Sequence, residues 1–115
     1  AHELPQFFED IGYADGAQIY KTLPYDLKDP NVRTYVKYGT GQDTPESYVY
    51  GKDWDTIDKT VSGDGDGTVN LRSLEAGLAK GWKNTEHEQF KGEDHQSVLK
   101  NDSLLAQLLD LAGAA

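Results

Sequence analysis

The sequence predicts an α/β fold, and it predicts a part of a domain rather than a whole one. A short helical pattern precedes a stretch rich in β-branched and aromatic residues, and two further helical patterns follow that stretch. Strands separated by helices are typical of a parallel sheet, which needs neighbouring strands and helices on both faces. The 115 residues contain too few predicted strands and helices to complete such a sheet.

The first half of the chain predicts one helix and two strands. Residues 5–12 begin with proline, place two phenylalanines and an isoleucine on one face, and end in glycine, as a short helix does. A loop with two prolines follows at 23–31. Residues 32–41 then predict a strand that ends in glycines, and 47–51 predict a second short strand. The polar residues at 53–67 predict an exposed approach to a glycine loop.

The second half predicts two helices and a weak strand. Apolar residues recur mostly at three- and four-residue steps over 69–82, which favours one helix. Residues 84–94 are nearly all polar, and Phe90 marks the expected end of a short strand. The tail is helical by pattern, with Asp102 or Ser103 as the expected N-cap. We expect its wide apolar stripe to face a core; the stripe consists of Leu104, Leu105, Leu108, Leu109 and Leu111.

Composition and charge exclude several classes of function. A net charge of −9, from 11 basic and 20 acidic residues, argues against nucleic acid as a partner, because phosphate backbones need clustered Lys and Arg. The absence of cysteine excludes disulfides, cysteine zinc sites and thiol nucleophiles. No apolar run approaches the roughly 20 residues that span a bilayer, and no signal-peptide pattern opens the chain.

The stretch VSGDGDGTVNLRS alternates glycines with aspartates, and three hypotheses address it. A phosphate cradle needs a lysine after the glycines, which is absent, and the carboxylates would repel phosphate. A calcium loop of the EF-hand type over 62–73 would use Asp64 and Asp66 as ligands and resembles the loops of dockerin modules. That loop would place Ser62 and Ser73 where acids are expected.

The third hypothesis is a catalytic carboxylate on the glycine-rich turn. Glycines leave room for an aspartate to pack closely against a histidine. In α/β-hydrolases the triad comes in the order Ser, Asp or Glu, then His, on loops after late strands. His95 begins a helical pattern 29 residues after Asp66, an interval with room for one helix and one short strand. The simpler alternatives are that Asp66 only forms a turn and that His95 is a surface residue capping the last helix.

Five blocks of sequence, in order, resemble one known family. They are FFEDIGYADG, YGTGQDTPESYVYG, GDGDGTVNLRSLE, a following Trp82, and GEDHQSVLKN. In this order they resemble the C-terminal part of the lecithin:cholesterol acyltransferase family, above all its lysosomal phospholipase A branch, from about Phe7 to about Leu105. The resemblance implies an α/β-hydrolase fold, of which residues 1–115 are the C-terminal segment.

The resemblance also implies an activity and two site residues. Members transfer a fatty acyl group of a phospholipid to water or a lipid alcohol, at a membrane or lipoprotein surface and without a cofactor or metal. The catalytic acid falls on Asp66 and the base on His95, although the residues alone do not decide between Asp66 and Asp64.

The family's nucleophilic serine, on a G-x-S-x-G elbow, matches none of the serines in this chain. We therefore expect an N-terminal serine-bearing segment of the same enzyme to supply it, and the chain alone to be inactive. A naturally serine-less binding or regulatory subunit is the remaining alternative.

Family resemblance further implies a lysosomal, vacuolar or secreted glycoprotein. Asn101, Asp102 and Ser103 form a glycosylation sequon at a matching place. The family's disulfide would join the positions that Val36 and Gly77 occupy here, so both cysteines are absent together. Their absence makes an oxidising compartment less certain.

Overall fold

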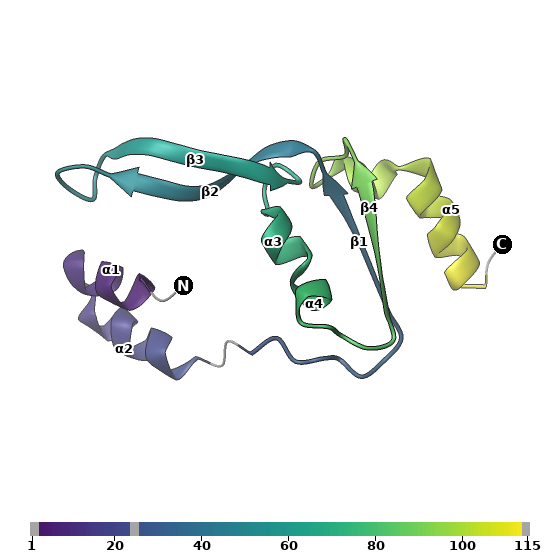
Figure 1. Ribbon diagram of the computed structural model, residues 1–115, viewed down its shortest axis with the longest axis horizontal. Coiled ribbons are helices and arrows are strands. Elements are labelled where there is room, and N and C mark those ends of the chain that lie inside the picture. Colours follow the sequence, from purple (N-terminus) through teal and green to yellow (C-terminus); the bar gives the residue numbers. More distant parts are fainter. Residues whose placement is uncertain (1–2, 24–25, 114–115) are drawn as a thin grey trace.

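Two small sheets organise the chain, as Figure 1 shows. The computed structural model describes residues 3–23 and 26–113, so residues 24 and 25 of the loop predicted at 23–31 lie outside the described residues. The molecule is elongated, with principal dimensions of 56 × 30 × 20 Å. The chain contains both helices and strands, which confirms the predicted mixed α/β class.

The first sheet is a parallel pair. Strand β1 (Thr34–Thr40) lies beside β4 (Thr85–Lys91), with Thr34 opposite Thr85 and Thr40 opposite Lys91. The strand predicted at 32–41 is thus confirmed, and the weak strand near Phe90 is a full partner for it. Parallel pairing requires a long crossover, which the intervening segments supply.

The second sheet is an antiparallel hairpin. Strand β2 (Gln42–Tyr50) follows β1 after Gly41 alone, and β3 (Ile57–Gly65) returns beside it. The short strand predicted at 47–51 therefore begins earlier. The exposed approach predicted at 53–67 is confirmed as exposed over most of its length, but most of it is also strand, which was not predicted. Strand β3 could not be recognised from the sequence. Nearly all of its side chains are exposed, so the strand has no alternation of apolar and polar residues.

The helices near the N-terminus lie below the hairpin in the view of Figure 1. Helix α1 (Leu4–Asp10) confirms the helix predicted at 5–12. Helix α2 (Ala14–Thr22) was not predicted, because its few apolar residues give a weak periodic signal. Aromatic side chains of α1 contact the far end of the hairpin, where Phe7 lies edge-on to Trp54 with 5.1 Å between ring centroids.

The helix predicted at 69–82 is broken into two short ones. Helix α3 (Leu71–Leu74) ends at Glu75, and α4 (Ala76–Ala79) follows. The Glu75 carboxylate accepts hydrogen bonds from Tyr38 Oη of β1 at 2.9 Å and from Gln89 Nε2 of β4 at 2.7 Å. These bonds tie the corner between the helices to the parallel sheet, so one straight helix does not form.

Gly77, one of the two positions matched to the family's disulfide, is buried in α4 beneath an aromatic ring. A Cβ at position 77 would lie 2.4 Å from the ring of Trp82. Position 36 lies on β1 and is half-buried. Trp82 therefore fills the space that a side chain at position 77 would need.

The C-terminal segment begins with a 3₁₀ turn (Ser97–Lys100) and continues as α5 (Asp102–Leu111). Asn101 caps α5, because its Oδ1 accepts a hydrogen bond from Leu104 N at 3.1 Å, so the expected cap at Asp102 or Ser103 is wrong by a residue or two. Of the leucine stripe only Leu104 is buried, in a small core with Phe90 and Val98. The other leucines are exposed.

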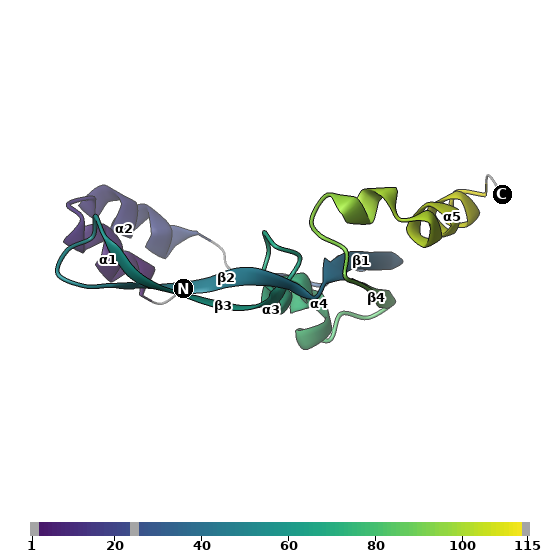
Figure 2. The ribbon, with the colours of Figure 1, turned by 90° about the horizontal axis from the view of Figure 1, so that it is seen from above.

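Figure 2 shows the layers: α3 and α4 lie on one side of the β1–β4 pair, and the 3₁₀ turn and α5 lie on the other. Helices on both faces of a parallel pair are typical of α/β domains. The described segments include no helix that is both long and apolar enough to cross a membrane.

Candidate functional site

A tight turn at the end of β3 holds Asp66. The carboxylate Oδ1 accepts hydrogen bonds from Thr68 N at 3.0 Å and Val69 N at 2.7 Å, while Asp66 N donates to Val69 O at 3.1 Å. Gly67 has φ of +89°, a left-handed conformation that glycine adopts without strain. The order Asp-Gly-Thr-Val therefore folds locally into a turn that fixes its own carboxylate.

The turn also closes against β2. A Cβ at Gly65 would lie 2.4 Å from Val69 O and 2.5 Å from Thr44 Oγ1, so only glycine fits there. Thr44 Oγ1 in turn accepts a hydrogen bond from Gly67 N at 2.9 Å. The start of the hairpin thus contributes directly to the shape of the Asp66 turn.

A second turn, after β4, presents His95. The Asp94 carboxylate Oδ1 accepts hydrogen bonds from Gln96 N at 2.8 Å and Ser97 N at 2.7 Å, and Asp94 N donates to Ser97 Oγ at 2.8 Å. These reciprocal bonds close the turn that leads into the 3₁₀ segment. The turn holds His95 at the surface, beside the Asp66 turn.

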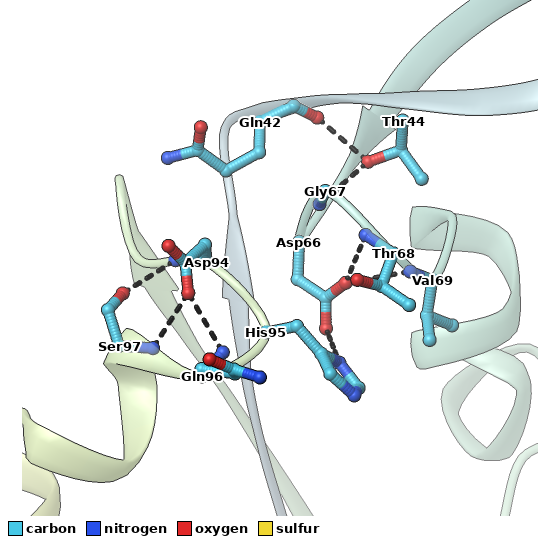
Figure 3. Close-up of polar contacts among 10 residues, drawn as sticks. All are labelled: Gln42, Thr44, Asp66, Gly67, Thr68, Val69, Asp94, His95, Gln96 and Ser97. Carbon is cyan, nitrogen blue, oxygen red and sulfur yellow. Dashed lines mark hydrogen bonds and ion pairs between the residues drawn. The ribbon is translucent and has the colours of Figure 1, made fainter.

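The two turns meet, and Asp66 and His95 are in contact, as Figure 3 shows. His95 Nδ1 lies 2.8 Å from Asp66 Oδ2, and His95 N donates to Asp66 O, also at 2.8 Å. The Asp66 side chain is 5% exposed and the His95 side chain is 52% exposed. Among residues 3–23 and 26–113, no side chain or main-chain group hydrogen-bonds to His95 Nε2, which leaves that nitrogen for an external group.

The structure separates the two candidate acids. Asp64 is exposed, and its Oδ1 accepts a hydrogen bond from Gly41 N at 2.7 Å, on the crossing between the two sheets. It has no contact with His95, whereas Asp66 has two hydrogen bonds to that residue.

Electrostatics keep the Asp66 carboxyl ionised. Burial by itself raises the pKa of Asp66, but hydrogen bonds from Val69 N, His95 and Thr68 N outweigh burial and lower the pKa below its ordinary value of 3.8. A buried carboxylate at Nδ1 favours the tautomer that carries its proton there and leaves the Nε2 lone pair outward. Such a pair can orient an imidazole, stabilise its protonated form and let Nε2 exchange a proton.

The aspartates of the calcium-loop hypothesis are engaged in other contacts in the structure. Asp66 directs both carboxylate oxygens at N–H groups or at His95, and Ser62 and Asp64 belong to β3. In the parts of the chain that the structure describes, no three His, Cys, Asp or Glu side chains gather where they could hold a metal ion.

Thr44 is the site residue that sequence analysis missed. Its side chain is completely buried, yet in the sequence it stands in a Thr-Pro pair that indicates only a turn. The signal available was its position within the block YGTGQDTPESYVYG, which carries part of the family resemblance. Its contact with Gly67 spans 23 residues and does not follow from local sequence.

Comparison with known proteins identifies relatives over nearly the whole chain. The model of the lecithin:cholesterol acyltransferase family matches residues 15–103. The chain is 41% identical over 114 residues to Lecithin-cholesterol acyltransferase-like 1 of Arabidopsis thaliana, covering 95% of this chain and 26% of that protein. It is 37% identical over 111 residues to Lysosomal phospholipase A and acyltransferase of Homo sapiens, covering 90% and 26%. It is 37% identical over 108 residues to Phosphatidylcholine-sterol acyltransferase of Gallus gallus, covering 84% and 25%.

The chain thus spans about a quarter of the length of these relatives. The family match contains both strands of the parallel pair, the hairpin, and the two turns that bring Asp66 and His95 together. It extends over well more than half of the chain, and the identities to individual relatives agree with it. On this evidence the chain belongs to the lecithin:cholesterol acyltransferase family.

Proposed function

We propose that this chain supplies the acid and the base of a Ser-His-Asp lipid acyl hydrolase or acyltransferase. Asp66 is the acid and His95 is the base, and the observation that supports these roles best is the 2.8 Å contact between Asp66 Oδ2 and His95 Nδ1. Residues 1–115 form the C-terminal segment of an α/β-hydrolase domain in this proposal. The nucleophilic serine belongs to an N-terminal segment of the same enzyme.

The proposed reaction has two acyl-transfer steps. In the first, His95 Nε2 removes the proton of the serine hydroxyl as the serine oxygen attacks the acyl ester of a phospholipid. The imidazolium then gives that proton to the departing lysophospholipid oxygen. In the second step, Nε2 takes a proton from water or a lipid alcohol as its oxygen attacks the acyl-serine. The imidazolium returns that proton to the serine oxygen as the acyl group leaves on the acceptor. Asp66 stabilises the imidazolium in both steps and itself remains deprotonated.

The surroundings of the pair support these roles. The pKa of Asp66 lies below its ordinary value, so the carboxylate remains charged in mildly acidic surroundings. Relatives carry names that describe phospholipase and acyltransferase activities, one of them lysosomal, which favours a phospholipid as acyl donor. We therefore also propose action at a membrane or lipoprotein surface and a lysosomal or secreted location.

Substitution of the acid tests the assignment. In the full-length enzyme, Asp66→Asn should lower kcat for acyl release from phospholipid vesicles by about 10⁴-fold, as for triad acids elsewhere, and His95→Ala by at least as much. Asp64→Asn is the matched control, because it removes a nearby carboxylate that does not contact His95, and it should retain near-normal activity. Near-normal activity of Asp66→Asn together with a large loss in Asp64→Asn would reverse the assignment.

The source of the nucleophile has its own test. Intact mass measurement of the native protein, together with any co-purifying chain, should find a serine-bearing G-x-S-x-G segment in the same polypeptide. A native protein of 115 residues with no such partner would favour the serine-less binding or regulatory subunit.

A further inference from the structure

Thr44 connects the hairpin to the turn that carries Asp66. It lies on β2, and its side chain is 0% exposed. Its hydroxyl accepts a hydrogen bond from Gly67 N at 2.9 Å and donates one to Gln42 O at 2.9 Å, as Figure 3 shows. A single hydroxyl therefore bridges the main chain of β2 and the residue that follows the acid.

Side-chain support for the turn from outside is sparse. Among the side chains that the structure describes beyond residues 65–69, only those of Thr44 and His95 form hydrogen bonds to this turn. The contact of Thr44 is made on the side opposite the carboxylate, at Gly67 N, and Gly65 permits it because a Cβ there would collide with the hydroxyl. Thr44 thus holds the turn through the main chain of Gly67, without contacting the Asp66 carboxylate through a hydrogen bond.

Removal of the hydroxyl would remove the acceptor of Gly67 N–H, and with it the side-chain hydrogen bond that ties the turn to β2, so the turn would no longer be held in this orientation. The turn can shift, because Gly67 is glycine and loses no side-chain packing when its φ changes. A rotation there displaces Asp66 Oδ2 from His95 Nδ1.

We propose that Thr44 is a positioning residue: its hydroxyl holds the Asp66 turn at the orientation that keeps the carboxylate on His95 Nδ1. This inference rests on the proposed function of Asp66 and His95. The start of β2 thus contributes to the reaction through Thr44, whereas the exposed outer part of the hairpin does not.

The kinetic test uses the full-length enzyme and three variants. Thr44→Val retains the shape and removes the hydroxyl, and it should lower kcat by about 10- to 100-fold with little change in KM, as small misplacements of catalytic groups do. Thr44→Ser keeps the hydroxyl and should remain within a few-fold of the unmodified enzyme. Thr60→Val is the matched control, because Thr60 is exposed on β3. If Thr44→Val fails to fold, Thr44→Ala against Thr44→Ser makes the same comparison, since that pair also differs by one hydroxyl.

A spectroscopic measurement separates positioning from general stability. The proton on His95 Nδ1 should give a low-field NMR resonance in the unmodified enzyme and in Thr44→Ser. In Thr44→Val it should move or vanish through exchange with solvent, while circular dichroism stays unchanged. Equal kcat and an unchanged resonance in the variant lacking the hydroxyl would overturn the inference.

The result with Asp66→Asn shows which proposal has failed. If Asp66→Asn is inactive and Thr44→Val is normal, only the role of Thr44 is wrong. If Asp66→Asn is active, the proposed function itself is wrong, whatever the behaviour of Thr44→Val.

Discussion

The two sheets have the same number of strands but differ in how they are stabilised. In the β1–β4 pair, Tyr38, Gly39, Thr40 and Phe90 are buried, and helices lie on both sides. In the hairpin, no residue between Thr44 and Gly65 is buried. The parallel pair and the first residues of the hairpin therefore determine the position of Asp66 and His95, whereas the outer hairpin is stabilised by other contacts.

Those other contacts are aromatic. Trp54, near the tip of the hairpin, packs against Tyr50 with 4.9 Å between ring centroids and against Phe7 of α1. Edge-to-face arrangements of this kind contribute about 0.5–1.5 kcal/mol each beyond the area they bury. We therefore expect substitutions in the outer hairpin to leave Asp66 and His95 in place, whereas substitutions in the parallel pair should displace them.

The largest expected difference is between two aromatic truncations. Phe90→Ala should reduce the free energy of unfolding by about 3–5 kcal/mol, because it empties the core shared with Val98 and Leu104. Tyr48→Ala on β2 should change that free energy by no more than about 0.5 kcal/mol, because Tyr48 is 51% exposed. Urea unfolding of both variants measures the difference. Equal losses would show that the outer hairpin is packed against another surface and would break the comparison.

A smaller difference is expected between two glycine substitutions. A Cβ at Gly39 would lie 2.2 Å from Glu93 O, in the backbone of the turn that presents His95. The atoms nearest to a Cβ at Gly51 belong to the flexible carboxylate of Asp58, at the surface. Gly39→Ala should cost about 1–3 kcal/mol of unfolding free energy and also lower activity, whereas Gly51→Ala should do neither. A loss of activity in Gly51→Ala would contradict the proposed independence of the hairpin tip.

The smallest expected effect is on the pH dependence of stability. Because the folded-state pKa of Asp66 is lower than 3.8, its ionisation stabilises the fold above about pH 4, and this contribution disappears as pH falls through the lower folded-state pKa. The difference in unfolding free energy between the unmodified protein and Asp66→Asn should therefore be greatest near neutral pH and shrink below pH 3.8. Thermal or urea unfolding at a series of pH values measures it. A difference that stays constant down to pH 2.5 or so would mean that the carboxylate is not the stabilised group.

Much of the fold was predictable where local sequence carries the signal. The segment of α1 places its phenylalanines and isoleucine on one face between a proline and a glycine, and β1 is rich in β-branched and aromatic residues, so both elements were predictable. Strand β3 was not, because a strand exposed on both faces has no such spacing. The cap of α5 was misplaced because Asn101, Asp102 and Ser103 are all good capping residues, and backbone geometry selects among them.

Sequence and family resemblance predicted the two residues of the candidate pair, but not the residue that holds the Asp66 turn in place. The order of residues and the family resemblance indicated Asp66 and His95, and the structure brings them into contact. Asp64 could not be separated from Asp66 by sequence, because both stand between glycines and the outcome depends on β3 ending at Gly65. Thr44 escaped prediction because its bond to Gly67 joins segments 23 residues apart.

The main-chain hydrogen bond from residue 95 to residue 66 does not depend on either side chain. An enzyme with alanine in place of His95 would therefore keep the spacing of the two loops, with an open, solvent-facing site beside the remaining carboxylate. Free imidazole in the buffer would bind at that open site and restore turnover in place of the missing side chain.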